Sequence, residues 1–378
     1  MRVAHIDHTD ERGGAELALA RILGTLPPWS PRLFVPPPRD DAVGAYATLA
    51  GDMVCRVGLL QPAGAIEANF KSRINLLSRV VGQAIALRAN RSFREVQLVH
   101  ANTSRAALIG LLSCVASHRK LVLHLRDSVD PAALGSLNSR LLGVAISRSD
   151  GVIANSAYTL RSANGYIRPG TPCTVIPSPI GLVENRIAVP VKQTTNTVGM
   201  LARITPWKGQ DLLIRAFARA FRGTNITLEL AGSADFGNRH YLDSLRKLVN
   251  DVQIERQVRF LGHVTNIWPL LDSWDICVHA STRSEPLGQN VLQYLAACRP
   301  TIAADSGGPK EWITDGVNGA LFGEGDEIAL SDKLVKLAND YRLREALSST
   351  LRDQRPVPAD SELTAMLDEF FKDVLRAR

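Results

Sequence analysis

Short apolar runs alternate with helical patterns along the first half of the chain. The first run, Val3 to Ile6, precedes a segment in which apolar residues recur at helical spacing from Leu17 to Leu26. Runs at 96–100 and 121–125 are separated by a further helical segment, and another run follows at 149–156. Parallel strands buried on both faces read as short apolar runs joined by helices. This half of the chain therefore predicts an α/β fold built on a parallel sheet.

A second alternation of the same kind follows a stretch without periodicity. Residues 181–195 mix polar residues with no repeat, and we interpret them as a linker. Apolar runs then return at 198–202, 227–230, 258–261 and 276–279. A single core seldom extends beyond about 250–300 residues, so a chain of 378 residues predicts two domains. We place these domains at 1–180 and 196–358, and the amphipathic tail at 360–378 predicts a final helix.

The segment from Glu67 to Arg91 has a long helical pattern. Its apolar stripe consists of Phe70, Ile74, Leu77, Val81 and Ile85, and the basic residues off the stripe are Lys71, Arg73, Arg79 and Arg91. One interpretation is a helix that packs on the sheet and leaves its basic face in water. The alternative is a surface helix that holds an anionic membrane or a phosphorylated acceptor, because basic amphipathic helices bind such surfaces.

Composition narrows the class of protein. No segment approaches the roughly 18 uncharged apolar residues of a membrane span, and the chain starts directly with a strand, so we expect a cytoplasmic protein. The five cysteines are scattered without a C-x-x-C pair, which argues against a disulfide framework or a zinc site. Residues 1–180 hold 20 Lys and Arg against 12 Asp and Glu, whereas residues 181–378 hold 24 against 25. An anionic partner or substrate is therefore expected at the first half.

Two loops of the second domain carry candidate chemistry. Arg203 and Lys208 follow a predicted strand and stand just before a helix. Two cations in such a loop can hold a diphosphate and stabilise it as a leaving group without a metal. Farther along, Glu285 and Gly288 lie between a strand and a helix whose free N–H groups favour an anion. The Gly-rich run Ser306 to Glu311 again lies between a predicted strand and a predicted helix. Together the loops predict a nucleotide site.

Gly13 and Gly14 open the first predicted helix. A dinucleotide site of the Rossmann type would require G-x-G-x-x-G at this place. That pattern is absent, which argues against an NAD-dependent enzyme. A Gly-Gly pair by itself is more typical of a turn.

The loop motifs resemble those of the retaining GT-B glycosyltransferases of the large fourth family, the glycosyl transferases group 1. Glu285 matches the first glutamate of the family's donor motif, and Arg203 and Lys208 match its upstream G-R-L-x-x-x-K-G motif. Gln293 replaces the second glutamate of the donor motif. An amide accepts through one oxygen only and brings two donors, so the ribose contact expected there is altered.

The resemblance implies a fold and a set of donor contacts. The fold is GT-B, an α/β architecture in which two Rossmann-like domains face each other across a cleft and the last helix, 360–378, packs back on the first domain. The sugar nucleotide is expected on the second domain, with Glu285 on the sugar and Arg203 and Lys208 on the diphosphate. The implied donor-binding residues are Gly13, Gly14, Arg203, Lys208, His263, Val264, Glu285, Leu287, Gly288, Gln289 and Gln293.

Polar residues at predicted strand ends of the first domain complete the expected site. Crevices in open α/β sheets lie at the carboxyl ends of strands, so we assign Asn102, Arg126 and Asp127 to the acceptor side. In the alternative interpretation Arg126 and Asp127 pair with each other. The resemblance implies that His124 lies beside the transferred sugar, although a lone histidine at a strand end is more often structural. The expected catalytic set is His124, Glu285, Arg203 and Lys208.

The expected function is retaining, metal-independent transfer of a hexose from a UDP- or GDP-sugar, with no cofactor. The acceptor classes are a glycan, a lipid-linked molecule or a natural product. Peripheral contact with the inner membrane face through the basic half is also expected. We expect no nucleic-acid partner. Two departures from the family pattern leave open a second interpretation, a non-catalytic subunit that binds sugar nucleotides. They are Gln293, and Ser178-Pro179 where the family often has Asn-Gly. A sugar-nucleotide 2-epimerase on the same fold is a third interpretation.

Overall fold

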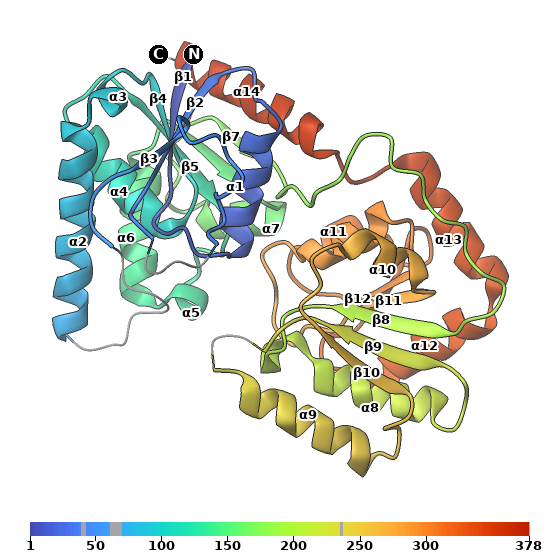
Figure 1. Cartoon of the computed structure of the whole chain (residues 1–378). Coiled ribbons are helices and arrows are strands. Elements are labelled where there is room, and N and C mark those ends of the chain that lie inside the picture. Colours follow the sequence, from blue (N-terminus) through green and yellow to red (C-terminus); the bar gives the residue numbers. More distant parts are fainter. Residues whose placement is uncertain (39–42, 61–69, 235–236, 378) are drawn as a thin grey trace. The chain divides into compact units, whose positions relative to one another are not determined.

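The computed structural model describes residues 1–38, 43–60, 70–234 and 237–377, and the chain forms two compact units (Figure 1). Unit 1 consists of Met1–Glu184 and Ala359–Arg378, and unit 2 of Asn185–Pro358. Glu67 to Asn69, at the start of the predicted long helix, lie outside the described residues. Within the described ranges, none of the helices combines the length and the apolar character needed to cross a membrane.

Unit 1 is built on a sheet of seven parallel strands in the order β3-β2-β1-β4-β5-β6-β7. The strands are β1 (Arg2–Ile6), β2 (Ser30–Val35), β3 (Val54–Arg56), β4 (Leu98–Ala101), β5 (Lys120–Leu125), β6 (Gly151–Ala154) and β7 (Cys173–Val175). The proline-rich stretch 27–38 contains β2, which pairs with β1 and β3. Pro31 occupies the second position of that strand, near the end where proline is tolerated.

Helices cover both faces of the unit 1 sheet (Figure 1). On one face lie α2 (Phe70–Ala89), α4 (Ser104–Cys114) and α6 (Ser136–Ser147), and on the other α1 (Gly14–Gly24) and α14 (Asp360–Arg376). The short helices are α3 (Arg91–Arg94), α5 (Pro131–Leu134) and α7 (Ala157–Ala163). Each main helix buries apolar side chains against strand residues, so both sheet faces contribute to the core of this unit.

The buried stripe of α2 differs from the stripe seen in the sequence. Val80, Ala84 and Leu87 are buried, whereas Leu77 and Ile85 are exposed. The side chains of Phe70 and Ile74 lie outside the described set. A helix with apolar residues on two adjacent stripes can pack either one, and the sequence does not state which. Helix α2 packs on the core of unit 1 as one interpretation expected, but through Val80 and Leu87 and not through Leu77 and Ile85.

The last helix, α14, belongs to unit 1 although it is the end of the chain. Phe371 and Val374 pack among residues of β1, β4 and β5. At its start, the Asp360 carboxylate accepts hydrogen bonds from the backbone N–H groups of residues 180–182, over 3.0–3.2 Å. These contacts tie the returning chain to the segment at which it leaves unit 1.

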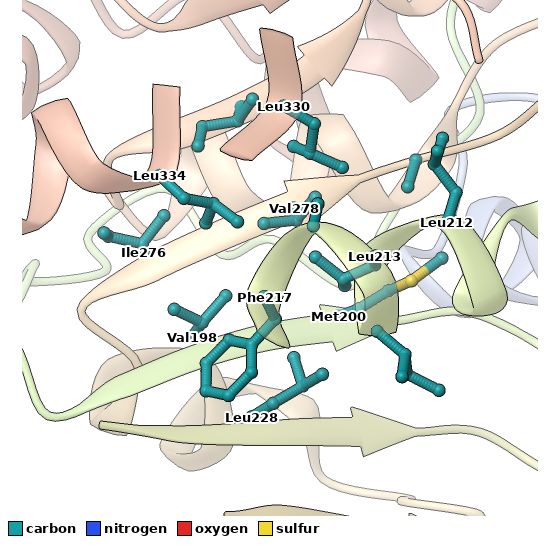
Figure 2. Packing of buried hydrophobic residues seen from close by; sticks show 14 of the residues in the cluster. Val198, Met200, Leu212, Leu213, Phe217, Leu228, Ile276, Val278, Leu330 and Leu334 are labelled. Carbon is teal, nitrogen blue, oxygen red and sulfur yellow. The ribbon is translucent and has the colours of Figure 1, made fainter. Parts of the chain in front are cut away.

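Unit 2 contains six parallel strands in the order β10-β9-β8-β11-β12-β13. The strands are β8 (Thr197–Leu201), β9 (Thr227–Ala231), β10 (Val258–Gly262), β11 (Ile276–His279), β12 (Thr301–Ala304) and β13 (Ala320–Phe322). The helical elements are η1 (Pro206–Lys208), α8 (Gln210–Phe221), α9 (Arg239–Asp251), α10 (Ile267–Ser273), α11 (Gln289–Ala296), η2 (Pro309–Trp312), α12 (Glu327–Asn339) and α13 (Tyr341–Gln354). Figure 2 shows the core in which Leu213 and Phe217 of α8 meet Leu330 and Leu334 of α12 over the strands.

Candidate active site

The carboxylate of Glu285 is the centre of a buried polar cluster in unit 2. Its Oε1 atom accepts from Lys208 Nζ at 2.6 Å and from His279 Nε2 at 2.9 Å, and Ser281 Oγ also donates to it. All three donors converge on one oxygen, and among the described residues none donates to Oε2. A further hydroxyl can therefore be accepted by this carboxylate.

Electrostatics keep Glu285 ionised. Burial by itself would raise the pKa of the carboxyl, but the Lys208 ammonium and the His279 ring outweigh burial and hold the pKa well below its usual range. Lys208 also lies over the ring of Trp207, 4.3 Å from its centroid. An ammonium has three N–H donors, so Lys208 can bind Glu285 and an additional anionic oxygen at the same time.

Glycines allow the loops around Glu285 to approach each other. Gly209, between η1 and α8, has φ = 73°, and a β-carbon there would lie 1.9 Å from the carbonyl oxygen of Ala280. Gly307 has φ = 64° and packs on the backbone of Glu285, which a β-carbon would meet at 2.4 Å. The Gly308 N–H donates to the Glu285 carbonyl at 2.8 Å. The Gly-rich run predicted from the sequence thus supports the loop that holds the carboxylate.

The other predicted donor residues lie on loops and helix starts of the same unit. Arg203 is exposed and follows β8, and its carbonyl accepts from Gln210 at 2.8 Å. His263 is exposed after β10, and Val264 packs partly into a neighbouring core. Leu287 and Gly288 are buried before α11, Gln289 is the first residue of that helix, and Gln293 is buried one turn on. Of the predicted donor residues, the structure brings Lys208 and Glu285 into direct contact.

Sequence reasoning missed two members of this cluster. His279 is the last residue of β11, and Ser281 follows it by two positions. Both bind the same oxygen of Glu285. The available signal was their place at the carboxyl end of a strand, where ligand crevices form, but many polar residues share that position.

A second polar cluster lies at the carboxyl end of the unit 1 strands. Asp7 accepts from Tyr46 Oη at 2.6 Å and from Asn102 Nδ2 at 2.7 Å. Arg126 donates to Asn102 Oδ1 at 2.7 and 2.9 Å and to Ser178 Oγ at 2.8 Å. The side-chain partners of Arg126 are therefore an amide and a hydroxyl. In the described part of the chain no ion pair joins Arg126 to the exposed Asp127, so the alternative interpretation is not supported.

The two carboxyl groups at this edge differ in charge. Burial would raise the pKa of Asp7, but hydrogen bonds and charge from His8, with hydrogen bonds from Tyr46 and Asn102, lower it. Glu16, which follows Gly13 and Gly14 in the first turn of α1, has its pKa raised to about 8 by burial and by the Asp7 charge. Asp7, His8 and Glu16 could hold a cation, since their ligand atoms lie within 4.8 Å of one another. The donors on Asp7 already balance much of its charge.

His124 lies in a buried chain of aromatic nitrogens beneath this cluster. Trp29 Nε1 donates to His5 Nε2 at 3.0 Å, His5 Nδ1 lies 2.9 Å from His100 Nδ1, and His100 Nε2 lies 3.2 Å from His124 Nδ1. Burial lowers the pKa of His5 to about 3 and holds the pKa of His100 and His124 well below the usual value, so all three rings are neutral.

The direction of this chain follows from its first member, because an indole N–H can only donate. His5 therefore accepts at Nε2 and donates from Nδ1, and His100 accepts at Nδ1 and donates from Nε2. His124 then accepts at Nδ1 and carries its proton on Nε2, an atom that is itself buried. In unit 1 neither ring nitrogen of His124 is accessible to solvent, and the contact with the sugar that the resemblance implies stays a prediction. The His124 ring is the last member of the buried chain and contacts His100.

Two α/β units, each a parallel sheet with polar loops at the carboxyl ends of its strands, define the class as a two-domain protein of the GT-B fold. Residues 184–354 match the model of the glycosyl transferases group 1, and residues 60–183 match that of glycosyltransferase family 4. Together the two matches span residues 60–354, and over them the chain is similar to the group 1 glycosyltransferases. The resemblance drawn from its loop motifs is confirmed.

Known relatives agree with this family. The chain is 27% identical over 316 residues to a D-inositol 3-phosphate glycosyltransferase of Kribbella flavida, covering 75% of this chain and 72% of the relative. It is 30% identical over 148 residues to the lipopolysaccharide core biosynthesis glycosyltransferase LpsE of Rhizobium meliloti, 39% of this chain and 41% of that protein. The chain thus spans less than half the length of the first curated relatives it matches.

Solved structures agree over nearly the whole chain. Anabaena HepE in complex with UDP-glucose is 25% identical, has a TM-score of 0.78, and the likeness covers 99% of this chain and 100% of HepE. A sucrose-phosphate synthase from Thermosynechococcus elongatus has a TM-score of 0.81 at 17% identity, with complete coverage of both chains, and shows the fold alone. The fold class predicted from the sequence is confirmed.

Proposed function

We propose that this glycosyltransferase moves a hexose from a UDP- or GDP-sugar to a glycan, a lipid-linked molecule or a natural product, with retention of configuration and without a metal. The observation that carries the proposal is the ionised, buried Glu285 with three donors on one oxygen. An acceptor-only carboxylate fixed in this way suits the hydroxyls of a sugar. The complex of HepE with UDP-glucose supports a uridine donor.

Lys208 and Arg203 are the proposed diphosphate ligands. Lys208 is held by Glu285 and keeps further N–H donors for phosphate oxygens. Arg203 lies on the same strand-to-helix loop. A fixed positive charge beside the departing diphosphate stabilises charge that develops in the transition state. Both residues therefore act on the leaving group, while Glu285 orients the sugar.

The remaining donor contacts are proposed from the loops that surround this pair. His263 and Val264 are proposed to lie along the base, and Gln293 to hold the ribose through its amide. The backbone around Leu287, Gly288 and Gln289 would supply N–H donors. Gly13 and Gly14 at the start of α1 would approach the donor diphosphate.

The unit 1 cluster is the proposed acceptor side. Asn102 and Arg126 are buried and mutually bound, and Asp127 is exposed beside them. Because Asp7 and Glu16 lie at the same edge, the site offers an ionised acceptor and a protonated donor for hydroxyl groups. We place the protein in the cytoplasm, where sugar nucleotides are made, and expect no nucleic-acid partner.

The test is a thermal-shift screen of nucleoside diphosphates and their sugars, followed by an assay of nucleoside diphosphate release with and without acceptors. A ligand at a hundred times its dissociation constant adds about 2.7 kcal/mol of stability. We expect a shift with a UDP- or GDP-sugar and release that depends on acceptor. Release without acceptor and with C2 inversion of the sugar would instead identify a 2-epimerase.

Gln293 favours one second candidate, a non-catalytic subunit that binds sugar nucleotides. An amide in place of a carboxylate removes a charge-assisted hydrogen bond worth about 1.5–3 kcal/mol and leaves a neutral one worth about 1. Binding without turnover across all three acceptor classes would support that candidate.

A further inference from the structure

A histidine and a carboxylate stand side by side just beyond the carboxyl end of β1. The side chain of Asp7 is fully buried, whereas that of His8 is exposed by 21%. The Nδ1 atom of His8 lies 3.2 Å from Asp7 Oδ1 and 2.9 Å from Oγ1 of Thr103. Among the described residues no hydrogen bond reaches Nε2 of His8, and this atom is not enclosed. One edge of the ring is therefore fixed by polar groups, and the other is accessible.

The position of the proton on His8 follows from the charge of Asp7. Although burial would raise it, hydrogen bonds and charge from the neighbouring groups lower the pKa of Asp7, so this carboxylate is ionised and can only accept. A lone pair on His8 Nδ1 would face the carboxylate at 3.2 Å and be repelled, whereas an N–H there is attracted. Nδ1 therefore carries the proton, and Nε2 keeps its lone pair.

Asp7 is itself held in place by other residues. Its Oδ2 atom accepts from Tyr46 Oη at 2.6 Å and from Asn102 Nδ2 at 2.7 Å. Thr103 donates to Oδ1 at 3.4 Å and also caps α4, because its Oγ1 accepts from the backbone N–H of Ala106. A histidine oriented by a fixed carboxylate is the arrangement that prepares an imidazole to accept a proton in catalysis.

We propose that His8 is the general base of the transfer reaction and takes the proton of the attacking acceptor hydroxyl at Nε2. The inference rests on the proposed function, since it adds a catalytic residue to the same reaction. As the acceptor oxygen forms its bond to the anomeric carbon, its proton moves to Nε2. The bond from that carbon to the diphosphate oxygen breaks, and its electron pair leaves with the diphosphate. Asp7 stabilises the imidazolium that forms.

The other titratable groups at this edge suit the role less well. Glu16 is buried and its pKa is raised to about 8, so its carboxyl already holds a proton at neutral pH. Both oxygens of Asp7 already accept hydrogen bonds. Asp127 is exposed, and in the described part of the chain no hydrogen bond orients its carboxylate. His8 combines a fixed ring with an accessible lone pair.

Asp7, His8 and Glu16 also lie close enough together to hold a cation. A cation there would have to displace the hydrogen bonds that Asp7 accepts from His8, Tyr46 and Asn102. The proposed base uses these hydrogen bonds as they are. Chelation separates the two interpretations, because only a bound metal can be removed by a chelator.

The experiment follows release of UDP from UDP-glucose, the donor bound by HepE, with water and with azide as acceptors. Water must lose a proton as it attacks, whereas azide is an anion that has none to lose. For His8→Gln we expect release with water to be slower by about 10²-fold or more, and formation of glucosyl azide to stay within about two-fold of the parent. His118→Gln, at an exposed histidine of the same unit, is the matched control and should equal the parent with both acceptors.

A second measurement does not depend on turnover. Nitrogen-15 chemical shifts of His8, assigned by their absence in His8→Gln, should show a proton on Nδ1 and a lone pair on Nε2. Absence of UDP release by the parent with both acceptors would contradict the proposed donor, and the nitrogen shifts would then decide on the Asp7–His8 pair by themselves.

Four results would overturn the assignment of His8 as the base. The first two are a proton on Nε2 in the protein without ligand, and equal effects of His8→Gln on the rates with water and with azide. The third is a larger loss with water in Asp127→Asn than in His8→Gln, which would assign the proton transfer to Asp127. The fourth is UDP release that stops with EDTA and returns with Mn²⁺, which would assign these side chains to a metal.

Discussion

The carboxyl edges of the two sheets carry polar clusters of opposite electrostatic character. In unit 2 a single carboxylate, Glu285, is surrounded by an ammonium and two other donors and is held ionised. In unit 1 two carboxyl groups, Asp7 and Glu16, share a buried region with Arg126; the pKa of Asp7 is lowered and that of Glu16 rises to about 8. Burial raises the pKa of every carboxyl group. The difference between the two clusters therefore shows that the neighbouring groups decide which carboxyl keeps its charge.

The sharpest test of the unit 2 cluster is Glu285→Gln. A neutral amide ends the charge pairing and leaves Lys208 buried without its counter-ion, so turnover should fall by about 10²- to 10³-fold. The free energy of unfolding at pH 7 should fall by about 3–5 kcal/mol. Nucleoside diphosphate release and urea unfolding measure the two effects. Asp243→Asn, at an exposed carboxylate of the same unit, is the control and should change neither; normal turnover in a folded Glu285→Gln variant would remove the role given to this carboxylate.

The histidines beneath the unit 1 edge should make stability depend on pH. Because the folded pKa of His5, His100 and His124 lies below the unfolded value of about 6.5, the unfolded chain binds more protons in acid. Their contribution is fully present above about pH 6.5 and is lost as pH falls toward the folded pKa. We expect a loss of about 1 kcal/mol for each histidine between pH 6.5 and 5.5, measured by urea unfolding.

The control for this pH effect is a pair of single variants. His100→Gln should lower the slope of stability against pH by about a third, whereas His118→Gln, at an exposed residue of the same unit, should leave it unchanged. Equal slopes in the two variants would show that the buried rings are not neutral in the folded protein.

Glu16→Gln should raise the free energy of unfolding at pH 7, whereas Glu285→Gln should lower it. The folded pKa of Glu16 is raised to about 8, so the stability from this group is present below the unfolded pKa of about 4.3 and is lost as pH rises toward 8. A neutral amide removes that loss, and the free energy of unfolding at pH 7 should rise by about 1–3 kcal/mol. Urea unfolding at pH 5 and pH 7 checks this, with a smaller gain expected at pH 5. A destabilised variant at pH 7 would mean that Glu16 is ionised there.

The smallest expected effect comes from Gln293→Glu, which restores the carboxylate that the family motif carries. A charged hydrogen bond to the ribose replaces a neutral one, so affinity for the nucleoside diphosphate should rise about three- to ten-fold. Isothermal titration gives the value, with Gln289→Glu as the neighbouring control. No gain for Gln293→Glu would indicate that the ribose lies elsewhere.

Much of the fold and the centre of the site could be predicted because both depend on local pattern. Parallel strands buried on two faces stand out as apolar runs, and Lys208 and Glu285 each follow such a run. His279 and Ser281 could not be singled out, because their role depends on which atom of Glu285 turns toward them. Contacts between side chains from separate loops are set by packing and leave no local signal.

The packing of α2 and the burial of His124 were not predicted for the same reason. The α2 stripe through Leu77 and Ile85 was correctly seen as apolar, but whether it meets the sheet depends on how α2 is rotated against α4. The position of His124 at a strand end is visible in the sequence, whereas the burial of its ring beside His100 is not. In both cases the sequence shows the character of a side chain and leaves open the direction in which it points.

The return of α14 to unit 1 also determines the order in which the two units can be completed during translation. Unit 2 has all its residues once Pro358 has been synthesised, whereas unit 1 still lacks Phe371 and Val374 at that point. The first part of unit 1 therefore waits for Ala359–Arg378, with the part of its sheet that α14 covers still exposed. A premature stop that spares unit 2 entirely would leave nascent unit 1 exposed to aggregation.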